Sequence, residues 1–117
     1  IKRLFSLIMP FTTPQRETYI WTRHAHDKMR HYRLTESRIK RIIRHPTRVE
    51  EGVIENAIAC MQPAGGKTYS EIWAMYLLSG ESIERKIKII TCWRYPSKSP
   101  SRDPIPSEIL REIQMLF

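Results

Sequence analysis

The amino-acid sequence predicts an α+β fold in which two N-terminal helices pack on an antiparallel sheet and a third helix closes the chain. The 117 residues are the size of one domain with a single core. Apolar residues recur with helical spacing over residues 23–44 and again near the C-terminus. Between them, over residues 48–95, β-branched and aromatic runs alternate with turn sequences. Because helix follows helix and strand follows strand along the chain, the sequence indicates an α+β fold rather than a parallel α/β fold.

The first helix is expected from residue 22 or 23 to residue 32, after a short β-prone run, ETYIWT, that predicts a further strand. Ala25, Met29 and Tyr32 recur at i, i+4 and i+7, so they form the stripe expected to be buried. A second stripe, displaced by one position, consists of His24, Lys28 and His31. Residues 1–16 form a poorly defined N-terminal segment of the same domain.

The second helix is expected to begin directly after Thr35. Thr35 is a good N-cap, and Leu34 can pack onto Ile39 across the helix start. Pro46 ends the helix, because the residue before a proline disfavours helical geometry. The predicted apolar face of this helix is Ile39, Ile42 and Ile43.

Three strand-like runs follow, at residues 53–61, 69–78 and 83–95, with the turn sequences QPAGGK and SGE between them. Such short connections predict an antiparallel meander of at least three strands. Alternation in the last run places two sets of side chains on opposite faces. One set is Ile83, Ile87, Ile89 and Trp93; the other is Glu84, Lys86, Lys88 and Arg94.

The last segment, residues 96–117, is expected to be a proline-rich loop and a closing amphipathic helix. The loop sequence is YPSKSPSRDPIP. The apolar side of the helix is Ile109, Leu110, Ile113 and Leu116. We therefore expect this helix to cover part of the domain.

Positive charge is concentrated in one quarter of the chain. The whole sequence carries a formal charge of +8. Residues 23–48 contain nine Lys and Arg against two acids, which is a net +7, and all four histidines. Such a patch is typical of a nucleic-acid binder. The alternative is a solvated cationic surface that serves solubility.

Other sequence features bear on the expected cellular location of the protein and on whether it binds a metal or cofactor. Cys60 and Cys92 lie within apolar runs, which fits reduced thiols in a cytoplasmic protein better than a disulfide framework. No apolar run approaches the roughly 20 residues that span a bilayer. A zinc site is not expected, because His24 and His26 at i, i+2 point to different helix faces. We expect no metal, no cofactor and no membrane association.

The order of several short motifs resembles a known superfamily. HAHDKM, LTESRIKRIIRHP, RVEEGVI and IITCWRY follow one another over residues 21–95. They resemble the small proteins that open with a His-Ala-x-x-Arg-Met helix and are related to BrnT-like and RelE-like ribonuclease toxins. Matching positions include His24, Ala25, Met29, Leu34, Thr35, Pro46, Thr91, Trp93 and Arg94. Lys28 and Tyr32 stand where arginine is usual in that pattern.

The resemblance implies helices on one face of the sheet, RNA on the other, and RNA cleavage by the ribose 2′-hydroxyl without a metal. That reaction needs proton transfer and a cation at the phosphate, roles suited to histidine and arginine. The catalytic candidates are His24, His26, Arg94, Tyr95 and Lys98. The candidates for holding nucleic acid are Lys28, Arg33, Arg38, Arg41, Arg44 and Lys88. We expect His24, near the first helix start, to share a phosphate site with Arg94.

Two other classes of function remain open from the sequence. Two short helices joined by RLT resemble a helix-turn-helix, which predicts a non-catalytic nucleic-acid binder, although strands follow here instead of a third helix. An inactive homologue would serve as an interaction module whose cationic groove holds an acidic antitoxin segment. The predicted partners are therefore RNA, including ribosome-bound mRNA, and an acidic antitoxin protein.

Overall fold

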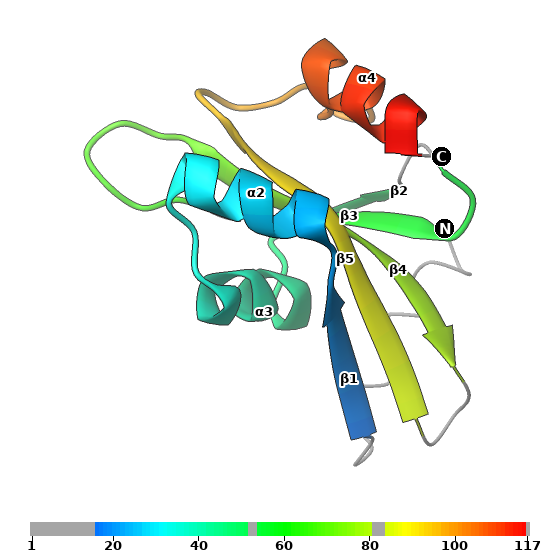
Figure 1. Ribbon diagram of the computed structural model, residues 1–117. Helices are drawn as coiled ribbons and strands as arrows, with labels where there is room; N and C mark the ends of the chain where they lie inside the picture. The colour runs from blue at the N-terminus through cyan, green and yellow to red at the C-terminus, as the bar shows by residue number, and fades with distance from the viewer. Residues whose placement is uncertain (1–15, 52–53, 81–83, 117) are drawn as a thin grey trace.

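The computed structural model describes residues 16–51, 54–80 and 84–116. Its elements are β1 (Arg16–Trp21), α2 (Arg23–Tyr32), α3 (Glu36–Arg44), β2 (Arg48–Glu51), β3 (Ala57–Pro63), β4 (Glu71–Gly80), β5 (Glu84–Tyr95) and α4 (Ser107–Leu116). The predicted α+β class is confirmed. In Figure 1, α2 and α3 lie together along the sheet, and α4 stands apart from this pair.

The five strands form one mixed sheet with the order β1-β5-β4-β3-β2. The meander is confirmed, since β2, β3, β4 and β5 pair antiparallel in sequence order. The sheet is not wholly antiparallel, because β1 adds to β5 in parallel, with Arg16 opposite Glu84 and Trp21 opposite Ile89. A parallel pair needs a long crossover, which the two helices and three strands between β1 and β5 supply.

The first predicted strand run, residues 53–61, corresponds to β3, and β2 is an additional strand that precedes this run. β2 ends at Glu51 and β3 begins at Ala57, with Asn56 in the left-handed region at φ +67° between them. Asparagine tolerates this conformation better than most residues. Val53 and Ile83, to which strand positions were assigned from the sequence, lie outside the described residues, as does most of the N-terminal segment.

Both helices of the pair have well-formed ends. The Thr22 hydroxyl accepts a hydrogen bond from the Ala25 amide at 3.1 Å and donates to the Ile89 carbonyl at 2.8 Å, which ties the start of α2 to β5. Arg33 ends α2 in the left-handed conformation at φ 59°. Thr35 caps α3, as predicted, by accepting from the Arg38 amide at 3.1 Å.

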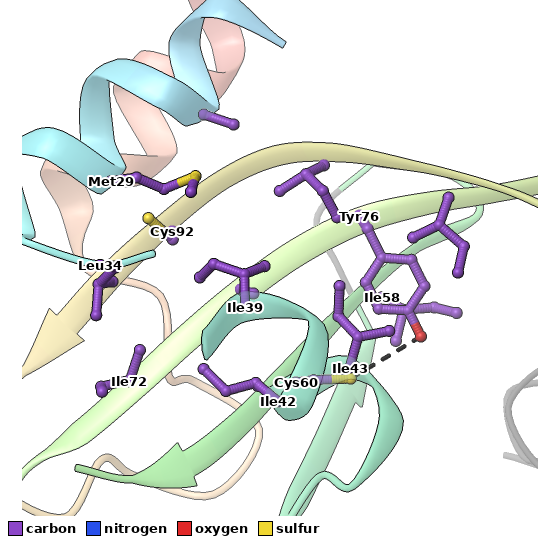
Figure 2. Packing of buried hydrophobic residues seen from close by; sticks show 14 residues of the cluster. Met29, Leu34, Ile39, Ile42, Ile43, Ile58, Cys60, Ile72, Tyr76 and Cys92 are labelled. Atoms are coloured by element: carbon purple, nitrogen blue, oxygen red, sulfur yellow. Dashed lines mark hydrogen bonds between the residues drawn. The ribbon is translucent and has the colours of Figure 1, made fainter. Parts of the chain in front are cut away.

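The face of the sheet beneath α2 and α3 forms the larger of two cores. The predicted stripes are confirmed, since Ala25 and Met29 of α2 and all three isoleucines of the α3 face are buried. Tyr32 is only partly buried. Figure 2 shows Met29, Ile39, Ile42 and Ile43 packed on side chains of the strands, namely Ile58, Cys60, Ile72, Tyr76 and Cys92.

The opposite face of the sheet carries α4. Ile109 and Ile113 of α4 are buried against a cluster that includes Trp73 and Trp93, whose rings stack with centroids 5.8 Å apart. The α4 helix thus covers part of the face on which the resemblance places RNA.

A β-bulge in β5 changes the predicted assignment of faces. Met75 is opposite Thr91 and Tyr76 is opposite Ile89, so Ile90 is an extra residue. Alternation therefore shifts by one position after Ile90. Trp93 lies on the α4 face and not with Ile87 and Ile89, and Arg94 lies on the face of α2 and α3, not with Glu84, Lys86 and Lys88.

A buried polar network fastens the proline-rich loop to the sheet. Glu71, at 0% exposure, accepts hydrogen bonds from the Ser99 hydroxyl at 2.6 Å, the Tyr69 hydroxyl at 2.7 Å and the Trp73 indole at 3.0 Å. Arg48 donates to the Ser99 hydroxyl at 2.9 Å and lies 3.7 Å from the Glu71 carboxylate. Burial acts to raise the pKa of Glu71, but the hydrogen bonds outweigh it and hold the pKa below its usual range. These polar groups are thus satisfied within the fold.

Candidate nucleic-acid interface

Three arginines that were predicted from the sequence as site residues lie close together near the junction of α2 and α3. Strand pairing places Arg94, Ile72 and Gln62 in one row across β5, β4 and β3. The Arg94 Nε donates to the Tyr32 carbonyl at 3.1 Å, at the C-terminal end of α2. At the other end of the row, Arg38 donates to the Gln62 side chain and, at 3.1 Å, to the Pro63 carbonyl. Arg38, Arg41 and Arg94 are called the arginine cluster below.

Gln62 connects this cluster to the end of α3. Its side-chain amide donates to the Arg41 carbonyl at 3.3 Å and to the His45 carbonyl at 2.7 Å. Its side-chain oxygen accepts from Arg38. Gln62 therefore satisfies carbonyl groups at the α3 C-terminus and orients Arg38 at the same time.

The arginine cluster lacks compensating negative charge in the described part of the chain. None of the ion pairs among the described residues involves Arg38, Arg41 or Arg94. The pKa of Arg38 is lowered, first by burial and then by the positive charges of Arg41 and Arg94. Mutually repelling cations without a counterion are a site where an anion binds favourably.

The cluster leaves hydrogen-bond donors unused. Arg94 donates only through Nε to the described residues, so its two terminal nitrogens remain available. Arg41 is exposed, and its side chain has no partner among the described residues. Planar guanidinium groups of this kind can bind phosphate oxygens in pairs.

His24 and Arg94 lie at opposite ends of α2. Tyr32, which holds Arg94, follows His24 by eight residues, which is about 12 Å along a helix. The His24 imidazole instead lies 3.6 Å from Glu112 of α4, and Lys28 lies 3.1 Å from the same carboxylate. The stripe of His24 and Lys28 thus faces α4, and the structure separates the two groups that a joint site needs.

Other candidates for catalysis lie apart from the cluster. Tyr95 is partly buried in the core beneath α4, on the face of the sheet opposite Arg94. Lys98 is exposed in the loop after β5. His26 is paired with Glu36 at 3.0 Å, and its ring stacks on Trp21.

The remaining cations predicted to hold nucleic acid are also distributed over the surface. Arg33 is exposed at the end of α2, next to Tyr32 and the cluster. Lys88 lies between Ile20 and Leu77 on the far face of the sheet. Arg44 pairs with Glu17 at 3.5 Å on the β1 side of α3.

Sequence reasoning missed two features of this region. Gln62 was taken as part of a turn, and only its place on β3 reveals its link to Arg38. Tyr19 and Trp21 stack with centroids 6.1 Å apart. Their i, i+2 spacing in a β-prone run was a signal that they share one face.

No group of three or more His, Cys, Asp or Glu that could hold a metal occurs among residues 16–51, 54–80 and 84–116. Over the same residues, none of the helices is long and apolar enough to cross a membrane. Comparisons with protein-family models, curated proteins and solved structures find no match for the chain. Membership of the RelE-like superfamily therefore stays a prediction from the motifs.

Proposed function

We propose that this protein binds RNA, and that the arginine cluster holds the phosphate groups. The observation that carries the proposal is the convergence of Arg38, Arg41 and Arg94 without a counter-charge in the described chain. Phosphate contacts by arginine and lysine supply most of the affinity of non-specific nucleic-acid binding. RNA is preferred to DNA as the ligand because of the resemblance to ribonuclease toxins.

The position of the cluster also bears on how RNA would approach. α4 packs on the central part of one face of the sheet, so RNA is proposed to bind at the edge of the other face, along α2 and α3. Two of the cations on α3 are already engaged within the fold, since Arg38 bonds to β3 and Arg44 pairs with Glu17. This arrangement favours phosphate contacts over insertion of α3 into a groove.

Toxin-like cleavage of the bound RNA is the second candidate, and the free donors of Arg94 favour it. The two terminal nitrogens of Arg94 have no partner among the described residues, so in this version they stabilise the charge on the phosphorane.

Binding is tested with fluorescein-labelled single-stranded RNA and fluorescence anisotropy. Arg41→Ala and Arg94→Ala should each weaken binding by about tenfold, whereas Arg111→Ala, which removes an equal charge from α4, should change it little. An equal loss for all three variants would indicate that only net charge matters. Incubation of labelled RNA with the protein and EDTA tests cleavage, and Arg94→Ala should abolish it at RNA concentrations that saturate binding.

An acidic peptide is the competing ligand for the same cluster. If a poly-glutamate peptide binds with an affinity equal to that of RNA and RNA cannot displace it, the RNA proposal fails. The interaction-module interpretation would then replace it.

A further inference from the structure

Three aromatic rings form a stacked array beside α3. Tyr19 and Trp21 project from one face of β1, with ring centroids 6.1 Å apart and planes 18° apart. The ring of His26, on α2, stacks on the Trp21 indole at 5.9 Å and 12°. These three rings are called the aromatic ladder.

Cations flank the Tyr19 end of the ladder. The Lys40 ammonium lies 5.0 Å from the centre of the Tyr19 ring, and the Arg44 guanidinium lies 5.7 Å from it. Both come from the flank of α3 that faces β1, whereas Arg38 lies on the flank that faces β3. Positive charge therefore extends across α3 from the arginine cluster to the ladder.

The two carboxylates near the ladder are already paired. Glu17 accepts from Arg44 at 3.5 Å, and Glu36 lies 3.0 Å from the His26 imidazole. Lys40 has no carboxylate partner among the described residues. Lys40 is thus the cation beside the ladder that remains available to a phosphate group.

All three residues of the ladder are partly exposed. Tyr19 and Trp21 also pack against the core, and the side chain of His26 is 40% exposed. The other two tryptophans, Trp73 and Trp93, are fully buried at 0%. Trp21 is therefore the tryptophan that a ligand at this surface would affect.

We propose that the His26 end of the ladder is a nucleobase-stacking site and that the RNA ligand is single-stranded. This inference rests on the proposed function. Aromatic faces bind unstacked bases of any sequence, whereas the bases of a duplex are already stacked on one another. A strand that crosses the exposed side of α3, a helix about 10 Å across, places its phosphates on the arginine cluster and one base on His26.

The test compares two labelled oligomers of equal length, oligoadenylate and an abasic ribose-phosphate chain, which differ only in their bases. His26→Ala should lower the affinity for oligoadenylate about tenfold more than it lowers the affinity for the abasic chain. The two losses are compared because removal of His26 also frees Glu36, whose negative charge weakens the binding of both oligomers. His45→Ala, at an exposed histidine at the end of α3 outside the ladder, is the matched control and should lower neither affinity by as much.

Tryptophan fluorescence gives a second reading that does not depend on a destabilising variant. Oligoadenylate should quench the fluorescence of the wild-type protein, and Trp21→Phe, which keeps an aromatic ring, should abolish the quenching while binding persists. A blunt RNA duplex of equal length should bind more weakly than oligoadenylate and should not quench.

The outcomes separate the two proposals. If His26→Ala weakens the two oligomers equally, or if quenching persists in Trp21→Phe, the stacking site is refuted while phosphate binding stands. If neither oligomer binds the wild-type protein, the proposed function itself fails.

Discussion

The Nε of Arg94 donates to the carbonyl of Tyr32 at 3.1 Å and so fixes the end of β5 to the C-terminal end of α2. This contact orients one guanidinium of the arginine cluster while leaving its terminal nitrogens for a ligand. The contact exists only because the bulge at Ile90 turns Arg94 toward the helices.

Arg94→Ala should reduce RNA affinity by about tenfold and destabilise the fold by no more than ~1 kcal/mol. The stability loss is small because the side chain is exposed and makes one hydrogen bond. Anisotropy and urea unfolding measure the two effects. If Arg94→Ala lowers the free energy of unfolding by several kcal/mol and also abolishes RNA binding, Arg94 is a structural residue instead.

Met29→Ala should destabilise the fold by ~2–5 kcal/mol, because it leaves a cavity between α2 and the sheet. Arg41→Ala, at an exposed position on α3, should stay within about 0.5 kcal/mol of the wild type. Urea unfolding measures the free energy of unfolding of both variants. An unchanged midpoint for Met29→Ala would contradict the packing in Figure 2.

Glu71 should make the stability of the loop attachment depend on pH. Its folded pKa lies below the ordinary value of 4.5, so its stabilising contribution is present above that value and is lost as the pH falls through the folded pKa. Glu71→Gln should therefore be less stable than wild type at pH 7, and the difference should shrink on acidification below pH 4.5. Urea unfolding at several pH values measures this, and a difference that grows on acidification would contradict the sign.

The two cysteines should stay unreactive in the native protein. Burial raises the pKa of both thiols to about 12. Strand pairing places Ala74 between them, so their Cα atoms are about 9.6 Å apart, too far for a disulfide. Alkylation by iodoacetamide should follow global unfolding in urea, and rapid modification without denaturant would show a more open core.

Local patterns in the sequence predicted the helices well. The spacing of Ala25 and Met29, and of Ile39, Ile42 and Ile43, depends only on the helical period, so the buried faces followed directly. The Thr35 cap is likewise a local signal.

Long-range and irregular features were not accessible in this way. Parallel pairing of β1 with β5 depends on residues far apart in sequence. The bulge at Ile90 has no proline or glycine to mark it, yet it moved Trp93 and Arg94 to the opposite faces. The arginine cluster was predicted residue by residue, but its assembly around Gln62, apart from His24, required the tertiary structure.

The dependence of RNA binding on salt tests the central claim most directly. For single-stranded RNA, each phosphate contact contributes about −0.7 to the slope of log affinity against log salt. The three arginines of the cluster predict a slope of about −2 or steeper, and Arg41→Ala should make it shallower by about 0.7 while Arg111→Ala leaves it unchanged. A wild-type slope near zero, or equal slopes for the wild type and Arg41→Ala, would contradict phosphate binding by the cluster.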